Sequence, residues 1–183
     1  MKRKIFVVTI LLAVAFGAYL FAIGGEKSGP QKNETKDIKQ LVNDYTLGKI
    51  ESASASITSH ELVVTDNDKN EITYDLPKDD FFVSIAPYTE KTHPCAIHSL
   101  TGCQGEMVEE EFSVYIEDMD GNVIVDQTSK SQSNGFIDLW LPRDKTYRVT
   151  IAHDGKTSES ELSTFKNDNT CITTMQLTNN KSA

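Results

Sequence analysis

Residues 112–125 read FSVYIEDMDGNVIV and carry the most regular pattern in the chain. Apolar residues occupy every second position of FSVYI, Asp120-Gly121 is a hairpin turn signal, and valine returns at both ends of VIV. Alternation of this kind places one side of a strand against a core and leaves the other side to solvent. The stretch therefore predicts an antiparallel β-hairpin.

The same alternation recurs on both sides of this hairpin, with turn residues between the apolar runs. It predicts further strands around residues 62–64, 72–76, 81–85, 136–141, 147–151 and 171–177. Residues 52–59 have no strong signal and are interpreted as a loop or a fraying helix. Because many short strands follow one another without a long helical pattern, we predict a mainly β protein, an antiparallel β-sandwich-like domain preceded by a short N-terminal helical segment.

That helical segment is the one convincing helix in the sequence. Thr35 can cap it and Gly48 can end it. The apolar positions between them have helical spacing and are Ile38, Leu41, Val42 and Tyr45. So short a helix is marginal in water on its own, so its apolar face packs either on the core or against a second copy of the chain.

The N-terminus has the features of an export signal. Residues 1–4 read MKRK, and residues 5–23 are apolar and uncharged. Two outcomes stay open, namely cleavage near Gly24 or retention of residues 5–23 as a membrane anchor. In both, the positive head favours the cytoplasm and the rest of the chain is extracytoplasmic, in the periplasm or on the outer face of the membrane, secreted or anchored.

These patterns divide the chain into four parts. Residues 1–24 are a signal peptide or anchor, 25–59 a tether with the helical segment, 60–178 the β-domain, which contains all three cysteines of the chain, and 179–183 a tail. The 183 residues have a formal net charge of −9, and three basic residues lie in the leader, so the exported part is more acidic still. An acidic domain is repelled by nucleic acid, and we exclude nucleic acid as a partner.

Three cysteines hold most of the functional information. Cys95 and Cys103 lie close together in sequence, whereas Cys171 lies near the C-terminus. An odd number of cysteines outside the cell leaves at least one thiol unpaired within the chain, and three converging thiolates suit the soft ion Cu(I). The alternative is a Cys95–Cys103 disulfide with Cys171 buried and inert.

Two histidines belong to the same segment. His98 lies between Cys95 and Cys103, and His93 lies just before them. Either imidazole could complete a Cys3His zinc site, which makes zinc the alternative metal. The alternative interpretation is that each histidine is an exposed loop residue that binds no metal. The sequence has no hydrolase or phosphate-loop motif, so no catalytic residue is predicted.

Several blocks of sequence around these residues resemble a known family. They are FFVSIAPY (81–88), THPC (92–95), HSLTGCQGE (98–106), GF (135–136) with LWLPR (139–143), and TCITTMQL (170–177). Together they are similar to the CueP family of extracytoplasmic copper-binding proteins, and the likeness covers residues 62–177.

The resemblance implies copper binding in the bacterial cell envelope, copper resistance, and delivery of copper to envelope enzymes. It implies that Cys95, Cys103 and Cys171 are the metal ligands. It also implies a homodimer formed by the N-terminal part, although this chain has only one helix there. Two alternatives remain, a thiol-based Cu(II) reductase that needs a thiol reductant to restore it, and a disulfide-stapled interaction module without metal.

Overall fold

The computed structural model describes residues 31–33 and 37–179, and Lys32–Ala183 forms one compact unit. The predicted signal or anchor in residues 1–24 and the predicted cap Thr35 lie outside the described residues. Among the helices that the structure describes, none is long and apolar enough to cross a membrane.

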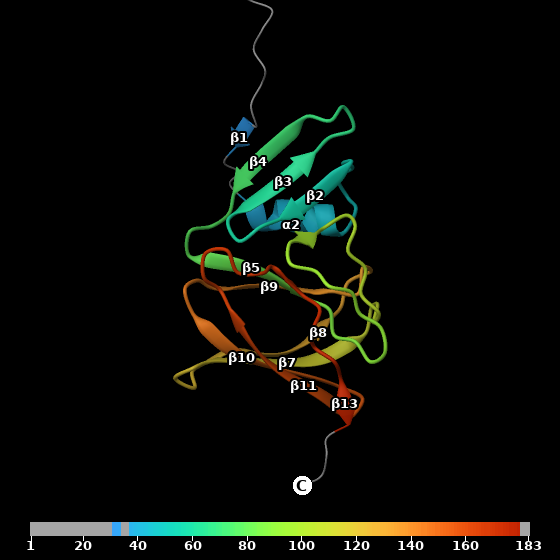
Figure 1. The fold of residues 1–183 in the computed structure, drawn as a ribbon, viewed down its shortest axis with the longest axis vertical. Coiled ribbons are helices and arrows are strands. Elements are labelled where there is room, and N and C mark those ends of the chain that lie inside the picture. Colours follow the sequence, from blue (N-terminus) through green and yellow to red (C-terminus); the bar gives the residue numbers. More distant parts are fainter. Residues whose placement is uncertain (1–30, 34–36, 180–183) are drawn as a thin grey trace, which may run out of the picture. The chain divides into compact units, whose positions relative to one another are not determined.

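The described residues form three β-sheets and one helix (Figure 1). The first sheet has the order β1-β4-β3-β2-β6, with β1 (Gln31–Asn33), β2 (Ser54–Ile57), β3 (Glu61–Thr65), β4 (Glu71–Asp75) and β6 (His98–Ser99). The second has the order β13-β11-β10-β7-β8, with β7 (Glu111–Asp118), β8 (Val123–Lys130), β10 (Thr146–His153), β11 (Lys156–Ser163) and β13 (Thr178–Asn179). The third has the order β12-β5-β9, with β5 (Asp80–Ile85), β9 (Ile137–Pro142) and β12 (Cys171–Ile172). The prediction of a mainly β protein with antiparallel sheets and one short N-terminal helix is confirmed.

The strand β5 is buried on both faces and belongs to two cores. One core lies between β5 and the second sheet, and β5 contributes Phe81, Val83 and Ile85 to it. The second sheet contributes side chains from β7 and β10, namely Phe112, Val114, Ile116, Tyr147, Val149 and Ile151. Phe82 faces the other core, shared with the first sheet and the helix. The β12-β5-β9 sheet is therefore a middle layer, which explains why residues 81–85 read as a continuous apolar run instead of alternating.

The helix α2 (Ile38–Thr46) lies between the first sheet and β5 (Figure 1). Its buried side chains Ile38, Val42 and Tyr45 pack into the second core. The apolar face of this helix therefore packs on the core. The observed N-cap is Asp37, whose carboxylate accepts a hydrogen bond of 2.9 Å from the backbone N–H of Gln40.

The hairpin predicted from residues 112–125 is confirmed as β7 and β8. The Asp118 carboxylate accepts hydrogen bonds from the backbone N–H groups of Asp120 and Asn122 at the turn. Gly121 has a φ of +84°, a conformation that costs glycine nothing.

The interpretation of residues 52–59 as loop or fraying helix is wrong, because they contain β2. Ala55 and Ile57 are fully buried and β2 pairs with β3. The signal is weak because serines and a small alanine alternate there, so the apolar side of the strand offers little contrast.

The C-terminal region also differs from the prediction. The predicted strand over residues 171–177 is interrupted: β12 pairs in parallel with β5, an isolated bridge joins Tyr88 to Gln176, and β13 follows. The strand β11 was not predicted, because its residues KTSESELS are almost all polar and only Leu162 is buried.

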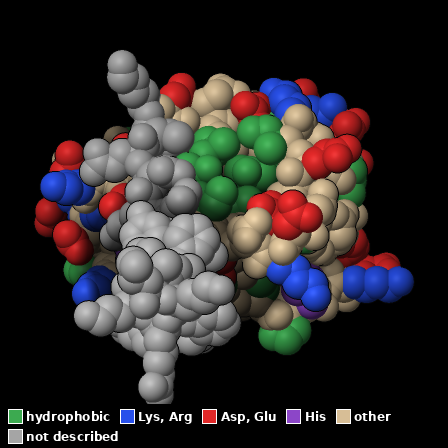
Figure 2. All heavy atoms as spheres, turned by 90° about the horizontal axis from the view of Figure 1, so that it is seen from above, with side chains coloured by type: hydrophobic (Ala, Val, Ile, Leu, Met, Phe, Trp, Pro, Cys, Tyr) green, Lys and Arg blue, Asp and Glu red, His purple; other side chains and the backbone are tan. Residues whose placement is uncertain are grey.

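The end of the molecule that carries the first sheet shows a group of hydrophobic side chains bordered by acidic and basic ones (Figure 2). The homodimer contact expected from the N-terminal part stays a prediction.

Candidate metal centre

The three cysteines come together on one buried wall. Cys171 on β12 forms a buried cluster with Ala86 and Phe136, and Cys95 and Cys103 pack against this cluster. Cys171 is 2% exposed, and the other two cysteines are partly exposed. The site therefore has a closed inner side and an open outer side.

The sulfur atoms lie close to one another and to two imidazoles. The Sγ atoms of Cys95 and Cys103 are 3.6 Å apart, too far for a covalent bond of about 2.05 Å, and all three cysteines are free thiols. The ligand atoms of His93, Cys95 and Cys103 lie within 4.8 Å of one another, as do those of His98, Cys103 and Cys171. Cys103 is thus common to both groups.

Hydrogen bonds fix the positions of the cysteine segments relative to one another. The carbonyl of Ala96 accepts from the N–H groups of Thr170 and Cys171 at 3.0 and 3.2 Å, which ties the Cys95 loop to β12. The Thr92 hydroxyl donates to the carbonyl of Thr173 at 2.6 Å. Both ends of the Cys95 loop are therefore fixed to the strand that carries Cys171.

The Cys103 loop is held by a different set of contacts. Its turn closes where Cys103 N–H donates to the Ser99 carbonyl at 3.0 Å, directly after β6. Gly105 N–H then donates to the Asn134 carbonyl at 2.7 Å. This second bond docks the Cys103 loop on the loop that carries Phe136.

The three thiols share protons unequally. The hydrogen bond from the Cys171 thiol holds the pKa of Cys103 well below that of a free thiol, against the effect of burial, and His98 adds to the lowering. The bond to Cys103 and burial raise the pKa of Cys171, and burial raises that of Cys95. Cys103 is therefore the most easily ionised of the three thiols, and a metal cation that binds all three sulfurs has to displace the protons that they carry.

His98 is fully buried, so the interpretation of this residue as an exposed loop histidine is wrong. Its ring lies 4.6 Å from the Phe136 ring, between centroids. Nε2 is 3.4 Å from the Ser84 hydroxyl, and Nδ1 has no hydrogen-bond partner. His93 is partly exposed, at a centroid distance of 6.4 Å from Phe136. The other four candidate residues thus lie close to Cys103.

Two polar residues behind the site were not predicted. Ser84 is fully buried and donates to the Asp138 carboxylate at 2.5 Å. Burial raises the pKa of Asp138, and hydrogen bonds from Ser84, Thr46 and Gln132 act in the opposite direction. A signal was available, because each is a polar residue inside an otherwise apolar strand.

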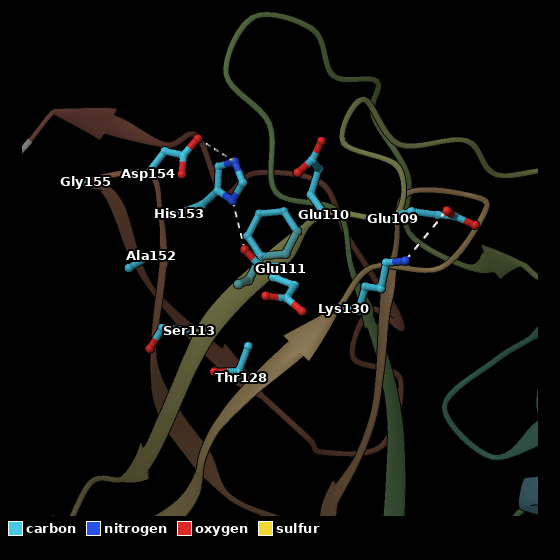
Figure 3. Close-up of a pocket in the computed structure, with 11 residues that line it drawn as sticks. Glu109, Glu110, Glu111, Ser113, Thr128, Lys130, Ala152, His153, Asp154 and Gly155 are labelled. Carbon is cyan, nitrogen blue, oxygen red and sulfur yellow. Dashed lines mark hydrogen bonds and ion pairs between the residues drawn. The ribbon is translucent and has the colours of Figure 1, made fainter.

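A separate hollow on the second sheet contains none of the cysteines (Figure 3). Its residues include three consecutive glutamates, His153 and Lys130. His153 Nδ1 lies 2.8 Å from the Glu111 carbonyl and Nε2 lies 3.5 Å from Asp154, while Lys130 lies 3.6 Å from Glu109. This hollow contains no cysteine or methionine, so it offers no soft ligand for an ion such as Cu(I).

Comparisons with known proteins show the family of the chain. The family described as "Periplasmic copper-binding protein CueP" matches residues 37–176. A solved structure, "Crystal Structure of S.CueP", is 36% identical in sequence, with a TM-score of 0.72, and the match covers 88% of this chain and 96% of that one. No curated protein sequence matches the chain. The family match includes all three cysteines, and the chain belongs to the CueP family.

Proposed function

We propose that this chain is an extracytoplasmic copper-binding protein that holds Cu(I) through the thiolates of Cys95, Cys103 and Cys171. The observation that carries the proposal is the gathering of three free thiols on one wall, from segments far apart in sequence. Thiolates are the soft ligands that select Cu(I). A wall closed by Phe136 and Ala86 shields the bound ion from water on its inner side.

Zinc is the alternative metal, and the two histidines determine how well the site suits it. A tetrahedral Cys3His site needs one imidazole, and His98 and His93 each lie within 4.8 Å of Cys103. Coordination number therefore does not disfavour zinc here. The preference for copper rests on ligand softness and on the greater intrinsic affinity of copper.

A second candidate function is reduction of Cu(II), favoured by the 3.6 Å separation of the Cys95 and Cys103 sulfurs. Two thiols that form a disulfide release two protons and two electrons, which convert two Cu(II) to two Cu(I). One disulfide forms per chain, so the reaction stops unless an external thiol reductant restores the pair.

The biological role that fits this chemistry is copper resistance, delivery of copper to an envelope enzyme, or both. The partners it requires are the copper ion, a copper-receiving enzyme and, for the redox cycle, a thiol reductant. The described family supports a periplasmic location. Cleavage or retention of residues 5–23, the four-part division of the chain and the homodimer stay predictions.

Competition against a Cu(I) chelator tests the proposal. We expect protein purified from the cell envelope under reducing conditions to bind one Cu(I) per chain. Replacement of any one cysteine by serine should weaken binding strongly, since a hard hydroxyl replaces a soft thiolate. The matched control is Ser131→Ala, which removes a buried hydroxyl outside the cysteine wall. Wild-type affinity in all three cysteine variants would refute the three-thiolate site.

A further inference from the structure

The carboxylate of Glu106, shortly after Cys103 in the sequence, is surrounded by hydrogen-bond donors from another loop. It accepts from three consecutive backbone N–H groups, those of Thr89, Glu90 and Lys91. The Thr89 hydroxyl donates to Oε1 at 2.7 Å, and the Lys91 N–H donates to Oε2 at 2.8 Å, so both oxygens are used. Hydrogen bonds to an ionised carboxylate are stronger than those between neutral groups. The carboxylate therefore joins the Cys103 segment firmly to this loop.

The donor segment, residues 89–92, leads directly to Cys95 and is also fixed to the chain beside Cys171. The Thr92 hydroxyl donates to the carbonyl of Thr173 at 2.6 Å. The segment of the third cysteine reaches residues 89–92 through the carboxylate described above. One short segment thus meets the chain close to each of the three cysteines.

The loops that carry Cys95 and Cys103 are anchored at different places. The Cys95 loop is tied to β12 through the Ala96 carbonyl, and the Cys103 loop is tied to the Asn134 carbonyl, which lies before β9. Both cysteines are partly exposed, and their sulfur atoms are 3.6 Å apart. Because the anchors are separate, the spacing of the two sulfurs depends on direct contacts between the loops, and Glu106 makes such contacts.

We propose that Glu106 is a positioning residue that holds the Cys95 loop against the Cys103 loop and so keeps their two sulfur atoms close enough to bind one metal ion. The inference rests on the proposed function for the metal, but the spacing of the sulfurs exists without it. Ligands that are already in place bind without the cost of ordering a loop. Outer-shell partners of metal ligands contribute about 10–100-fold to affinity. We expect the lower end of this range, because Glu106 holds a loop and not a ligand itself.

Competition for Cu(I) on Glu106→Gln tests the role. The amide keeps the size of the side chain but replaces one acceptor oxygen by a donor, which faces the N–H groups. We expect Cu(I) affinity to fall about 10-fold, and Thr89→Val, which removes only the hydroxyl donor, to lower it less. The matched control is Glu109→Gln, which removes the same charge from a carboxylate 3.6 Å from Lys130. Wild-type affinity in Glu106→Gln, or an equal loss in Glu109→Gln, would overturn the inference.

Cysteine variants separate positioning from a general effect on the fold. If Glu106 acts by placing Cys95, Glu106→Gln should have no further effect on Cu(I) affinity in a Cys95→Ser background. Its effect should persist in a Cys171→Ser background, where the sulfurs of the two loops remain. An equal loss in the wild type and in Cys95→Ser would show that Glu106 acts only through the fold, and would overturn the inference.

The spacing is also measured without metal, by the thiol–disulfide equilibrium of Cys171→Ser protein in a glutathione buffer. Oxidised glutathione accepts two electrons and two protons from Cys95 and Cys103, which gives their disulfide and two molecules of reduced glutathione. Glu106→Gln should lower the equilibrium constant, because a released loop lowers the effective concentration of one thiol at the other. An unchanged constant would overturn the inference. If the wild type bound no Cu(I), the proposed function would fail, while this measurement would still decide the role of Glu106.

Discussion

Replacement of Gly105 by alanine should separate the two loops that bring Cys103 to Phe136. A Cβ at Gly105 would lie 2.6 Å from the carbonyl oxygen of Gly135 and 3.2 Å from the Cβ of Ala86. Ordinary contact begins at 3.4 Å, so the backbones must part by about 0.8 Å. Neither neighbour is a flexible side chain that could move aside.

The cost is that of an overpacked site. Overpacking typically destabilises by about 1–3 kcal/mol, and a protein of this size loses about 2–4 °C of melting temperature per kcal/mol. We therefore expect Gly105→Ala to lower the melting temperature of the reduced, metal-free protein by about 2–12 °C. Cu(I) affinity should fall as well, because the Cys103 loop moves away from Cys171.

Gly102→Ala is a matched control on the other side of Cys103. A Cβ there would meet mainly the Ser99 hydroxyl at 2.9 Å, the end of a side chain that can rotate. Calorimetry and Cu(I) competition on both variants compare the same chemical change in the same turn. Equal melting temperatures and equal copper affinities for the two variants would refute the argument that the Gly105–Gly135 contact holds the site together.

Three further predictions address acid stability, redox chemistry and metal choice. Burial alone would raise the pKa of Glu106, but hydrogen bonds from Lys91 N–H, Glu90 N–H and both donor groups of Thr89 lower it from 4.5 to about 2. The ionised carboxylate therefore contributes its full stabilisation above pH 4.5, and this contribution is lost as the pH falls toward 2. Acid unfolding of Glu106→Gln should lack this contribution, and identical unfolding curves for the variant and the wild type would contradict the prediction. Fully reduced protein mixed with excess Cu(II) should release up to two Cu(I) per chain to a chromogenic chelator, and mass mapping should find the Cys95–Cys103 disulfide. If the thiols stay reduced and no Cu(I) appears, the protein does not reduce Cu(II) and only carries the metal. Protein purified from medium that holds both metals should contain copper, and stoichiometric zinc without copper would favour a Cys3His site.

The sequence predicted those elements whose signal is local. Alternation and turn residues suffice for β7 and β8, because the two strands of a hairpin are consecutive in sequence and pair from Glu117 with Val123 near the turn to Glu111 with Lys130 at the open end. They fail for β2 and β11, where serine and small residues pair with neighbours that supply the apolar contacts. Those two strands form because they pair with neighbouring strands, and this pairing depends on the assembled sheet and not on their own sequence.

The same limit applies to the site. The types and spacing of the cysteines indicate a soft metal ligand set, and the structure brings these residues to one wall. Ser84 and Asp138 read as isolated polar residues in two strands about fifty positions apart. Only the register of β5 with β9 places Ser84 directly opposite Asp138. That register follows from the packing of the whole sheet.

X-ray absorption at the copper edge tests the central claim most directly, because it counts the sulfur atoms bound to the metal. Cu(I)-loaded protein, wild type and Cys171→Ser, would be measured under reducing conditions. We predict three sulfur ligands in the wild type and one fewer in the variant, since Cys171 lies on the same wall as Cys95 and Cys103. An unchanged sulfur count in Cys171→Ser would contradict the account, and copper would then be bound without the buried cysteine.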